Sequence, residues 1–233
     1  MSLRAVLFDF GGVISSSPFE AFSNLERTRG LPAGFIRQVN ATNPDDNAWA
    51  RLERSEIDLT TFSAAWTEEA RALGHDLDGR EVLRGLAGTI RPAMVEAVRV
   101  CTTRYKTACL TNNFNGSDTH VSGSTGAVYA LFDAVFESRV LGVRKPDPRF
   151  YESACEALDV SPSECVFLDD LGVNLKPARA LGMQTIKVVD PDDALCELAG
   201  FTGLTFPDLA AGDPPGAPHY SDRIPGADIP SYE

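Results

Sequence analysis

The chain has 233 residues, of which 43% are hydrophobic and 23% are charged, the balance of a globular protein that forms a core without disulfides or structural metals. Its formal net charge of −12 argues against nucleic acid as a main partner, because phosphate backbones bind basic surfaces. It has no apolar run of the roughly 18 residues that a membrane helix needs, and no evident cleavable leader. We therefore expect a soluble, cytoplasmic protein that binds neither nucleic acid nor a membrane. Its oligomeric state stays open.

The first element expected along the chain is a buried strand in residues 4–10, RAVLFDF, which ends at Asp9 and is followed by two glycines. Residues 16–88 then have helical spacing throughout and contain no convincing strand. We expect helices there within 17–30, 32–42, 44–56 and 59–74. This block is a candidate cap, inserted into a domain formed by residues 1–15 and 89–202.

Strands and helices alternate after residue 88, which predicts an α/β fold: a Rossmann-like parallel sheet with helices on both faces. The expected strands lie within 105–113, 133–138, 164–170 and 184–190, and the expected helices within 91–104, 147–160 and 171–183. Residues 203–233 are rich in Pro and Gly and predict an extended tail. The five cysteines are odd in number and lack CxxC spacing, so we expect reduced core thiols.

Polar residues follow three of the expected strands at the point where each strand ends. They are Asp9, the run Thr111-Asn112-Asn113, and the pair Asp169-Asp170. In an open parallel sheet, ligands bind outside the carboxyl ends of the strands. Each group also has an ordinary structural explanation, since Asp170 could cap the next helix and the Thr-Asn-Asn run could form a turn. Their common location favours a functional site.

This set of residues suits phosphoryl transfer. Asp9 can attack phosphorus as a nucleophile, and a hard cation such as Mg²⁺ can bring the two anions together. Asp9, Asp170 and the backbone carbonyl of Gly11 are candidate Mg²⁺ ligands, and Lys145 in GVRKPDP is a candidate to neutralise phosphoryl charge. The candidate hydrogen-bond donors to phosphate are Thr111, Asn112 and the backbone N–H groups of the Phe10-Gly11 turn.

Four segments in this order resemble the motifs of the haloacid dehalogenase-like (HAD) hydrolase superfamily: FDFGGVI, LTNN, GVRKPDPRFYE and FLDDLGVNLKPARALGM. The resemblance covers roughly residues 4 to 190. The second half is especially similar to the N-terminal phosphatase domains of soluble epoxide hydrolases and related HAD phosphatases. The resemblance implies a hydrolase with this fold, Mg²⁺ as cofactor and a small phosphorylated molecule as substrate.

The resemblance also implies a role for each motif residue. Asp9 is the nucleophile, Asp170 is a metal ligand, and Asn174 is a nearby site residue where many relatives carry Asp. Asp169 would orient Lys145 or the metal-bound waters, while Thr111 and Asn112 bind phosphate. Residues 16–88 match a small helical cap, and we expect three of its aromatic residues to form its core rather than its pocket: Trp49, Phe62 and Trp66.

The sequence departs from this family pattern at Gly11. Phosphatases of the superfamily usually carry an aspartate there, two residues after the nucleophile, as general acid and base, a role typically worth about 10²–10⁴ in rate. Substrates with good leaving groups, or a substitute such as His75 or His120, could compensate. Two alternatives stay open: a metal-independent 2-haloacid dehalogenase, and a catalytically weak phosphate-binding module.

Overall fold

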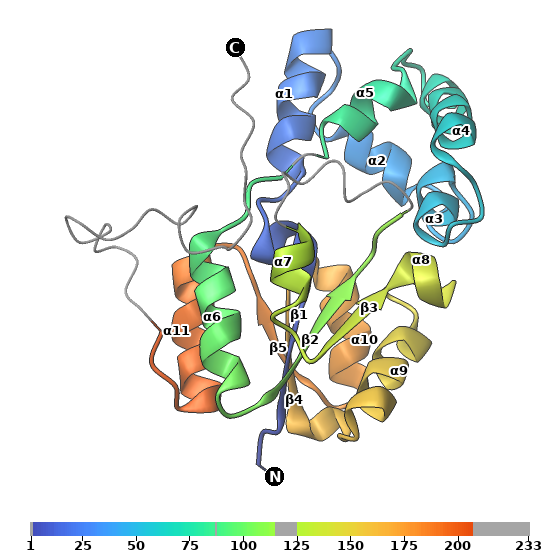
Figure 1. Cartoon of the computed structure of the whole chain (residues 1–233). Helices are drawn as coiled ribbons and strands as arrows, with labels where there is room; N and C mark the ends of the chain where they lie inside the picture. Colours follow the sequence, from blue (N-terminus) through green and yellow to red (C-terminus); the bar gives the residue numbers. More distant parts are fainter. Residues whose placement is uncertain (1, 87, 115–124, 207–233) are drawn as a thin grey trace, which may run out of the picture.

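The computed structural model describes residues 2–86, 88–114 and 125–206, and its centre is a five-stranded parallel sheet (Figure 1). The strand order is β3-β2-β1-β4-β5, and every neighbouring pair is parallel. The predicted α/β fold is therefore confirmed. The strands are β1 (Ala5–Phe8), β2 (Lys106–Thr111), β3 (Ala134–Glu137), β4 (Cys165–Asp169) and β5 (Gln184–Lys187).

Helices cover both faces of this sheet, with α6 and α11 on one side and α9 and α10 on the other (Figure 1). Alternate side chains of the central strand point to opposite faces of the sheet. Val6 and Phe8 pack in the apolar cluster with α6 and α11, and Ala5 and Leu7 pack in the cluster with α9 and α10. Burial on both faces explains why β1 is a continuous apolar run. The helices around the sheet are α6 (Pro92–Thr102), α7 (Thr125–Tyr129), α8 (Ser138–Leu141), α9 (Pro148–Leu158), α10 (Gly172–Ala180) and α11 (Pro191–Thr202).

Helices α1 to α5, which the structure describes between β1 and α6, pack together above the carboxyl ends of the strands; we call them the α1–α5 bundle (Figure 1). They have an apolar cluster of their own, in which Phe62 and Trp66 are fully buried. The chain enters and leaves the bundle side by side, since Ser15 and Ile90 form an antiparallel bridge. The helices are α1 (Phe19–Arg29), α2 (Phe35–Ala41), α3 (Ala48–Glu53), α4 (Leu59–Ala72) and α5 (Gly79–Arg84).

Among the described residues, four α-helices were not predicted individually from the sequence. Three of them, α5, α7 and α8, have only four to six residues and are too short to show an apolar period. The fourth, α11, begins after Asp190, whose carboxylate accepts backbone hydrogen bonds from Asp192 and Asp193.

All five cysteines are free thiols, but Cys196 is exposed rather than in the core. Most of the predicted tail, residues 207–233, lies outside the described residues.

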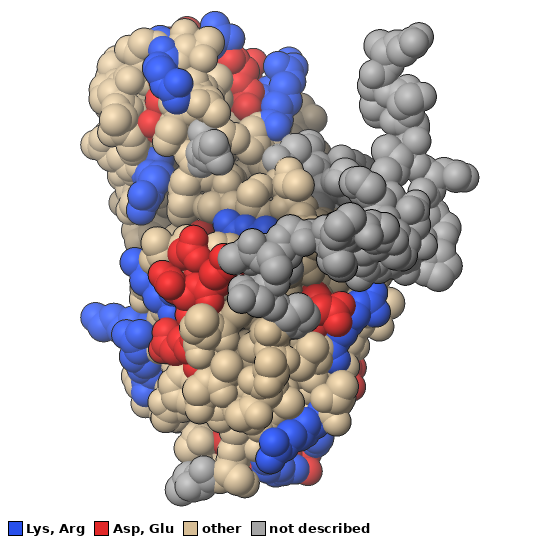
Figure 2. All heavy atoms as spheres, turned by 90° about the vertical axis from the view of Figure 1, so that its left-hand side faces the viewer, with Lys and Arg blue, Asp and Glu red and all other residues tan. Residues whose placement is uncertain are grey.

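Charged side chains are interspersed on the face shown in Figure 2, where Lys and Arg lie in separate patches rather than in one basic surface. Within the described ranges, no helix has the length and apolar character needed to cross a membrane.

Candidate active site

Asp9 lies where β1 runs into a tight turn, Phe10–Ile14, whose two glycines have non-helical backbone angles. Its backbone N–H donates to the carbonyl of Leu168 in β4 (2.8 Å), so the sheet itself fixes the position of this residue. Its carboxylate Oδ1 accepts from the backbone N–H of Phe10 (2.7 Å). The residue is 7% exposed and lines the large cavity between the sheet and the α1–α5 bundle.

The two glycines after Phe10 differ in their surroundings. Gly12 has φ +80°, and a Cβ there would lie 2.2 Å from Oδ2 of Asp170. Gly11 has ordinary extended angles (φ −71°, ψ 127°), and a Cβ there would have no neighbour within 4 Å. The turn therefore requires glycine at position 12, where the backbone approaches Asp170, but not at position 11.

We expect Gly12→Ala to displace Asp170 and to lower the free energy of unfolding by about 1–3 kcal/mol, because the left-handed conformation strains any residue with a Cβ. Gly11→Ala is the matched control and should stay close to wild type. Urea denaturation of both variants measures the difference. Equal stability of the two would contradict the close approach at Gly12.

Lys145 is the buried cation of the site. Its side chain is 1% exposed, and its Nζ lies 2.8 Å from Oδ1 of Asp9 and 2.7 Å from Oδ2 of Asp169. Burial alone would lower the pKa of Lys145, but the charges of Asp169 and Asp9 outweigh it and raise the pKa above its usual range. Lys145 is thus held as an ammonium beside the carboxylate of Asp9.

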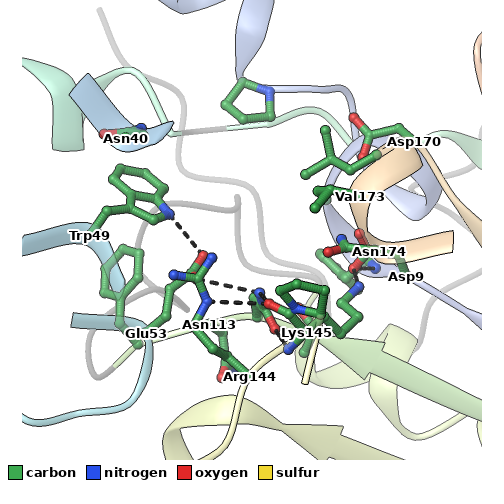
Figure 3. Close-up of a pocket in the computed structure, with 18 of the residues that line it drawn as sticks. Asp9, Asn40, Trp49, Glu53, Asn113, Arg144, Lys145, Asp170, Val173 and Asn174 are labelled. Carbon is green, nitrogen blue, oxygen red and sulfur yellow. Dashed lines mark hydrogen bonds and ion pairs between the residues drawn. The ribbon is translucent and has the colours of Figure 1, made fainter. Parts of the chain in front are cut away.

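The neighbouring aspartates on β4 and just after it have different surroundings. Asp169 accepts from Lys145, from the backbone N–H of Leu171 (2.8 Å) and from Nδ2 of Asn174 (3.0 and 3.1 Å). Asp170 accepts a hydrogen bond from the hydroxyl of Ser17 (3.2 Å) and faces the cavity. This geometry suits Asp169 to orienting Lys145. It leaves Asp170, which is labelled in Figure 3, available as a ligand.

The three carboxylates form a group that fits a divalent cation. One oxygen each of Asp9, Asp169 and Asp170 lies within 4.8 Å of the others. Burial raises the pKa of Asp9 well above its usual range, with Lys145 acting against it, and burial and the charge of Asp169 raise the pKa of Asp170 to about 6. With all three ionised, one ammonium leaves two negative charges uncompensated, and hard cations such as Mg²⁺ prefer carboxylate oxygens.

The phosphate donors predicted from the sequence are only partly available. Thr111, at the end of β2, is buried and lines the cavity. The side-chain amide of Asn112 instead holds the backbone of Lys145: its Oδ1 accepts from the N–H and its Nδ2 donates to the carbonyl, both at 2.9 Å. The N–H of Asn113 donates to Ser138 (3.0 Å). Of the two predicted side-chain donors, this leaves the Thr111 hydroxyl. Of the predicted backbone donors, the Phe10 N–H already donates to Asp9.

The cavity above these residues has a volume of about 1050 Å³ and is lined by both parts of the molecule. Trp49 of the bundle lines it (Figure 3), so the expectation that Trp49 belongs to the core alone is wrong. Phe62 and Trp66 are core residues, as expected. His75 packs edge-on against Phe35 and does not line the cavity. His120 lies outside the described residues. The aromatic lining comprises Phe10, Phe19, Phe22, Trp49, Phe114 and Tyr129.

Sequence reasoning missed several residues that shape the site. Ser17 contacts Asp170, and Arg91 donates to the carbonyl of Gly12 at 2.7 Å. Glu53 of α3 forms an ion pair with Arg144, the residue before Lys145 (2.9 Å). Their positions depend on how the bundle packs on the sheet. Of these residues, only Arg144 could have been suspected from the sequence, because it directly precedes Lys145 in GVRKPDP.

Relatives of this chain include proteins with named activities. Acyl-CoA dehydrogenase family member 10 of Mus musculus is 35% identical over 212 residues, 87% of this chain and 19% of that protein. Bifunctional epoxide hydrolase 2 of Sus scrofa is 31% identical over 219 residues, 88% of this chain and 40% of that protein. The chain thus spans well under half of either. Phosphatase MT3486 of Mycobacterium tuberculosis is 33% identical over 198 residues, 81% of this chain and 88% of that protein.

A solved structure supports the fold independently. A HAD family enzyme from Bacteroides thetaiotaomicron, in complex with magnesium and inorganic phosphate, superposes with a TM-score of 0.56 at 18% identity, over 80% of this chain and 94% of that one. The sequence model of haloacid dehalogenase-like hydrolases matches residues 3–182. The resemblance seen in the four motifs is therefore confirmed, and the chain belongs to the haloacid dehalogenase-like hydrolase family.

Proposed function

We propose that this hydrolase is a Mg²⁺-dependent phosphatase that acts on a small phosphorylated molecule through an aspartyl-phosphate on Asp9. The observation that carries the proposal is the pairing of Asp9 with buried Lys145 at 2.8 Å, at the floor of a cavity beside two further carboxylates. One relative is named a phosphatase, and the match covers 88% of that protein. This likeness supports the same activity.

In this mechanism an oxygen of Asp9 attacks phosphorus, and the bond from phosphorus to the ester oxygen breaks. The electron pair leaves with the ester oxygen, which then takes a proton. Water next attacks the aspartyl-phosphate, releases phosphate and restores the carboxylate of Asp9. Lys145 stabilises the charge on the phosphoryl oxygens, and Thr111 donates a hydrogen bond to them.

Asp9, Asp170 and the carbonyl of Gly11 are the groups that would hold Mg²⁺, with Asp169 close behind them. Bound there, the ion would offset the negative charge of the carboxylates and of the incoming phosphate. A glycine at position 11 still supplies a backbone carbonyl. It supplies no acid for the leaving group, so we propose substrates whose leaving group departs without strong protonation.

The three grouped carboxylates do not favour the alternative of a metal-independent dehalogenase, because displacement at carbon gains nothing from a cation site. The domain arrangement belongs to the same proposal: residues 16–88 are the cap, residues 1–15 and 89–202 are the catalytic domain, and 203–233 are a tail. A cytoplasmic location and the lack of nucleic-acid and membrane partners stay predictions.

Hydrolysis of p-nitrophenyl phosphate and acetyl phosphate, each with Mg²⁺ and with EDTA, tests the proposal. Both substrates have leaving groups that need little protonation, so Gly11 should not prevent turnover. We expect turnover with Mg²⁺, its loss in EDTA, and its return when Mg²⁺ is added in excess. Turnover that persists in EDTA would contradict the metal requirement. No turnover of either substrate by a folded protein would contradict the phosphatase and favour a phosphate-binding module.

A further inference from the structure

Glu53 belongs to α3 of the α1–α5 bundle, but its side chain contacts Arg144 and Asn112 of the sheet domain (Figure 3). Its side chain is 8% exposed, and both carboxylate oxygens have partners. Oε1 accepts from the indole N–H of Trp49 at 2.9 Å. Oε2 lies 2.9 Å from Nε of Arg144 and 3.3 Å from Nδ2 of Asn112. One buried carboxylate thus joins a cavity wall of the bundle to two residues of the sheet domain.

The two partners of Glu53 in the sheet domain both control the backbone of Lys145. Nε of Arg144 donates to the backbone carbonyl of Lys145 at 3.2 Å. The side chain of Asn112 accepts from the backbone N–H of Lys145 and donates to the same carbonyl. Lys145 in turn contacts Asp9. A continuous series of polar contacts therefore runs from Trp49, through Glu53, to the nucleophile.

These contacts exist only while the bundle is seated on the sheet. If the bundle moved away, Arg144 and Asn112 would both lose their contacts with the Glu53 carboxylate. Nη1 of Arg144 also lies 3.5 Å from the backbone carbonyl of Pro44, in the loop before α3. The seated position of the bundle and the position of Lys145 are thus linked by the same side chains.

We propose that Glu53 is a positioning residue that couples seating of the α1–α5 bundle to the placement of Lys145. Glu53 does not touch the reacting atoms: it acts through Arg144 and Asn112. The same carboxylate holds Trp49 in the cavity wall, so contact of a substrate body with Trp49 strengthens the arrangement that places the lysine. The catalytic part of this inference rests on the proposed phosphatase activity, whereas the coupling itself does not.

Four variants test the inference: Glu53→Gln, Arg144→Gln, the double variant, and Glu56→Gln as control. Glu56 lies three residues beyond Glu53 and is also ion-paired with an arginine (Arg54, 2.6 Å), but it is 46% exposed and does not line the cavity. Two measurements are made: kcat and KM for p-nitrophenyl phosphate with Mg²⁺, and hydrogen exchange of the peptide that spans residues 143–147.

We expect Glu53→Gln and Arg144→Gln each to lower kcat by about 10- to 100-fold with KM changed by no more than about threefold, because a small misplacement of a catalytic group is costly. The double variant should lose little more than either single one, since the two residues act as one unit. Exchange in residues 143–147 should be faster in all three, and Glu56→Gln should match wild type in both measurements.

A Glu53→Gln variant that matches Glu56→Gln in kcat and in exchange would overturn the inference, and so would losses that multiply in the double variant. If the wild type hydrolyses nothing, the proposed phosphatase fails, and exchange alone decides the coupling: faster exchange supports it and unchanged exchange refutes it. Thermal unfolding of each variant shows whether a loss of kcat reflects unfolding.

Discussion

Replacing Gly11 with aspartate should raise kcat for a simple alkyl phosphate, such as glycerol 2-phosphate, by about 10²–10⁴-fold, the usual contribution of a general acid. An alkoxide is a poor leaving group and departs readily only when it is protonated. The gain for p-nitrophenyl phosphate should be much smaller, because its leaving group needs little protonation. The measurement is the ratio of kcat for the alkyl phosphate to kcat for p-nitrophenyl phosphate, which should be higher in the variant than in wild type.

The structure has room for this aspartate. Position 11 has extended backbone angles that any residue can adopt, and no atom lies within 4 Å of the place that a Cβ would take there. Gly11 lines the cavity beside Asp9, so a side chain there would enter the space in which the substrate is bound. The carbonyl proposed to hold Mg²⁺ belongs to the backbone and would be retained.

Gly11→Asn is the matched control, because it has almost the same size as Gly11→Asp but cannot donate a carboxylic proton. It should leave the ratio near that of wild type. Gly11→Asp also adds a carboxylate to a site that already holds three, so its Mg²⁺ requirement should be measured again. An aspartate variant that behaves like the asparagine variant would show that a proton donor is not what the wild-type site lacks.

Much of the floor of the candidate site could be predicted from the sequence, because its carboxylates lie at the ends of strands. Asp9 and Asp170 follow continuous apolar runs, and parallel strands bring their carboxyl ends to one edge of the sheet. Lys145 was predicted as a cation for the phosphoryl group, but its burial was not, since a lysine in a loop is ordinarily exposed. Its burial depends on three elements, β1, β4 and the loop before α9, that meet only in the folded chain.

The walls of the cavity could not be predicted in the same way. Trp49 has the helical spacing of a core residue. The apolar period of a helix does not distinguish a face that packs into a core from a face that lines a cavity. The side chain of Asn112 looked like a phosphate donor because it follows β2. It instead pairs with the backbone of Lys145, 33 residues away, and that choice is set by tertiary packing.

Replacing Asp9 and replacing Lys145 should differ in their effects on stability, although both changes should abolish turnover. We expect Asp9→Asn to lower phosphatase turnover by at least about 10³-fold, because an amide cannot replace the attacking carboxylate. The same variant should unfold at the same or a higher urea concentration than wild type. It removes one of three clustered carboxylates, and burial together with this clustering raises the pKa of Asp9 in the folded protein.

Lys145→Met should also be inactive, but it should lose about 3–5 kcal/mol of the free energy of unfolding, since it leaves buried carboxylates without their cation. Arg71→Met is the control: Arg71 also pairs with two carboxylates, Glu68 (2.7 Å) and Asp76 (2.8 Å), but on the surface, where solvent screens the pairs. Its unfolding midpoint should stay near that of wild type. If Lys145→Met were as stable as Arg71→Met, the buried ammonium would not hold the carboxylates together. If Asp9→Asn were the less stable variant, Asp9 would be a structural residue as much as a nucleophile.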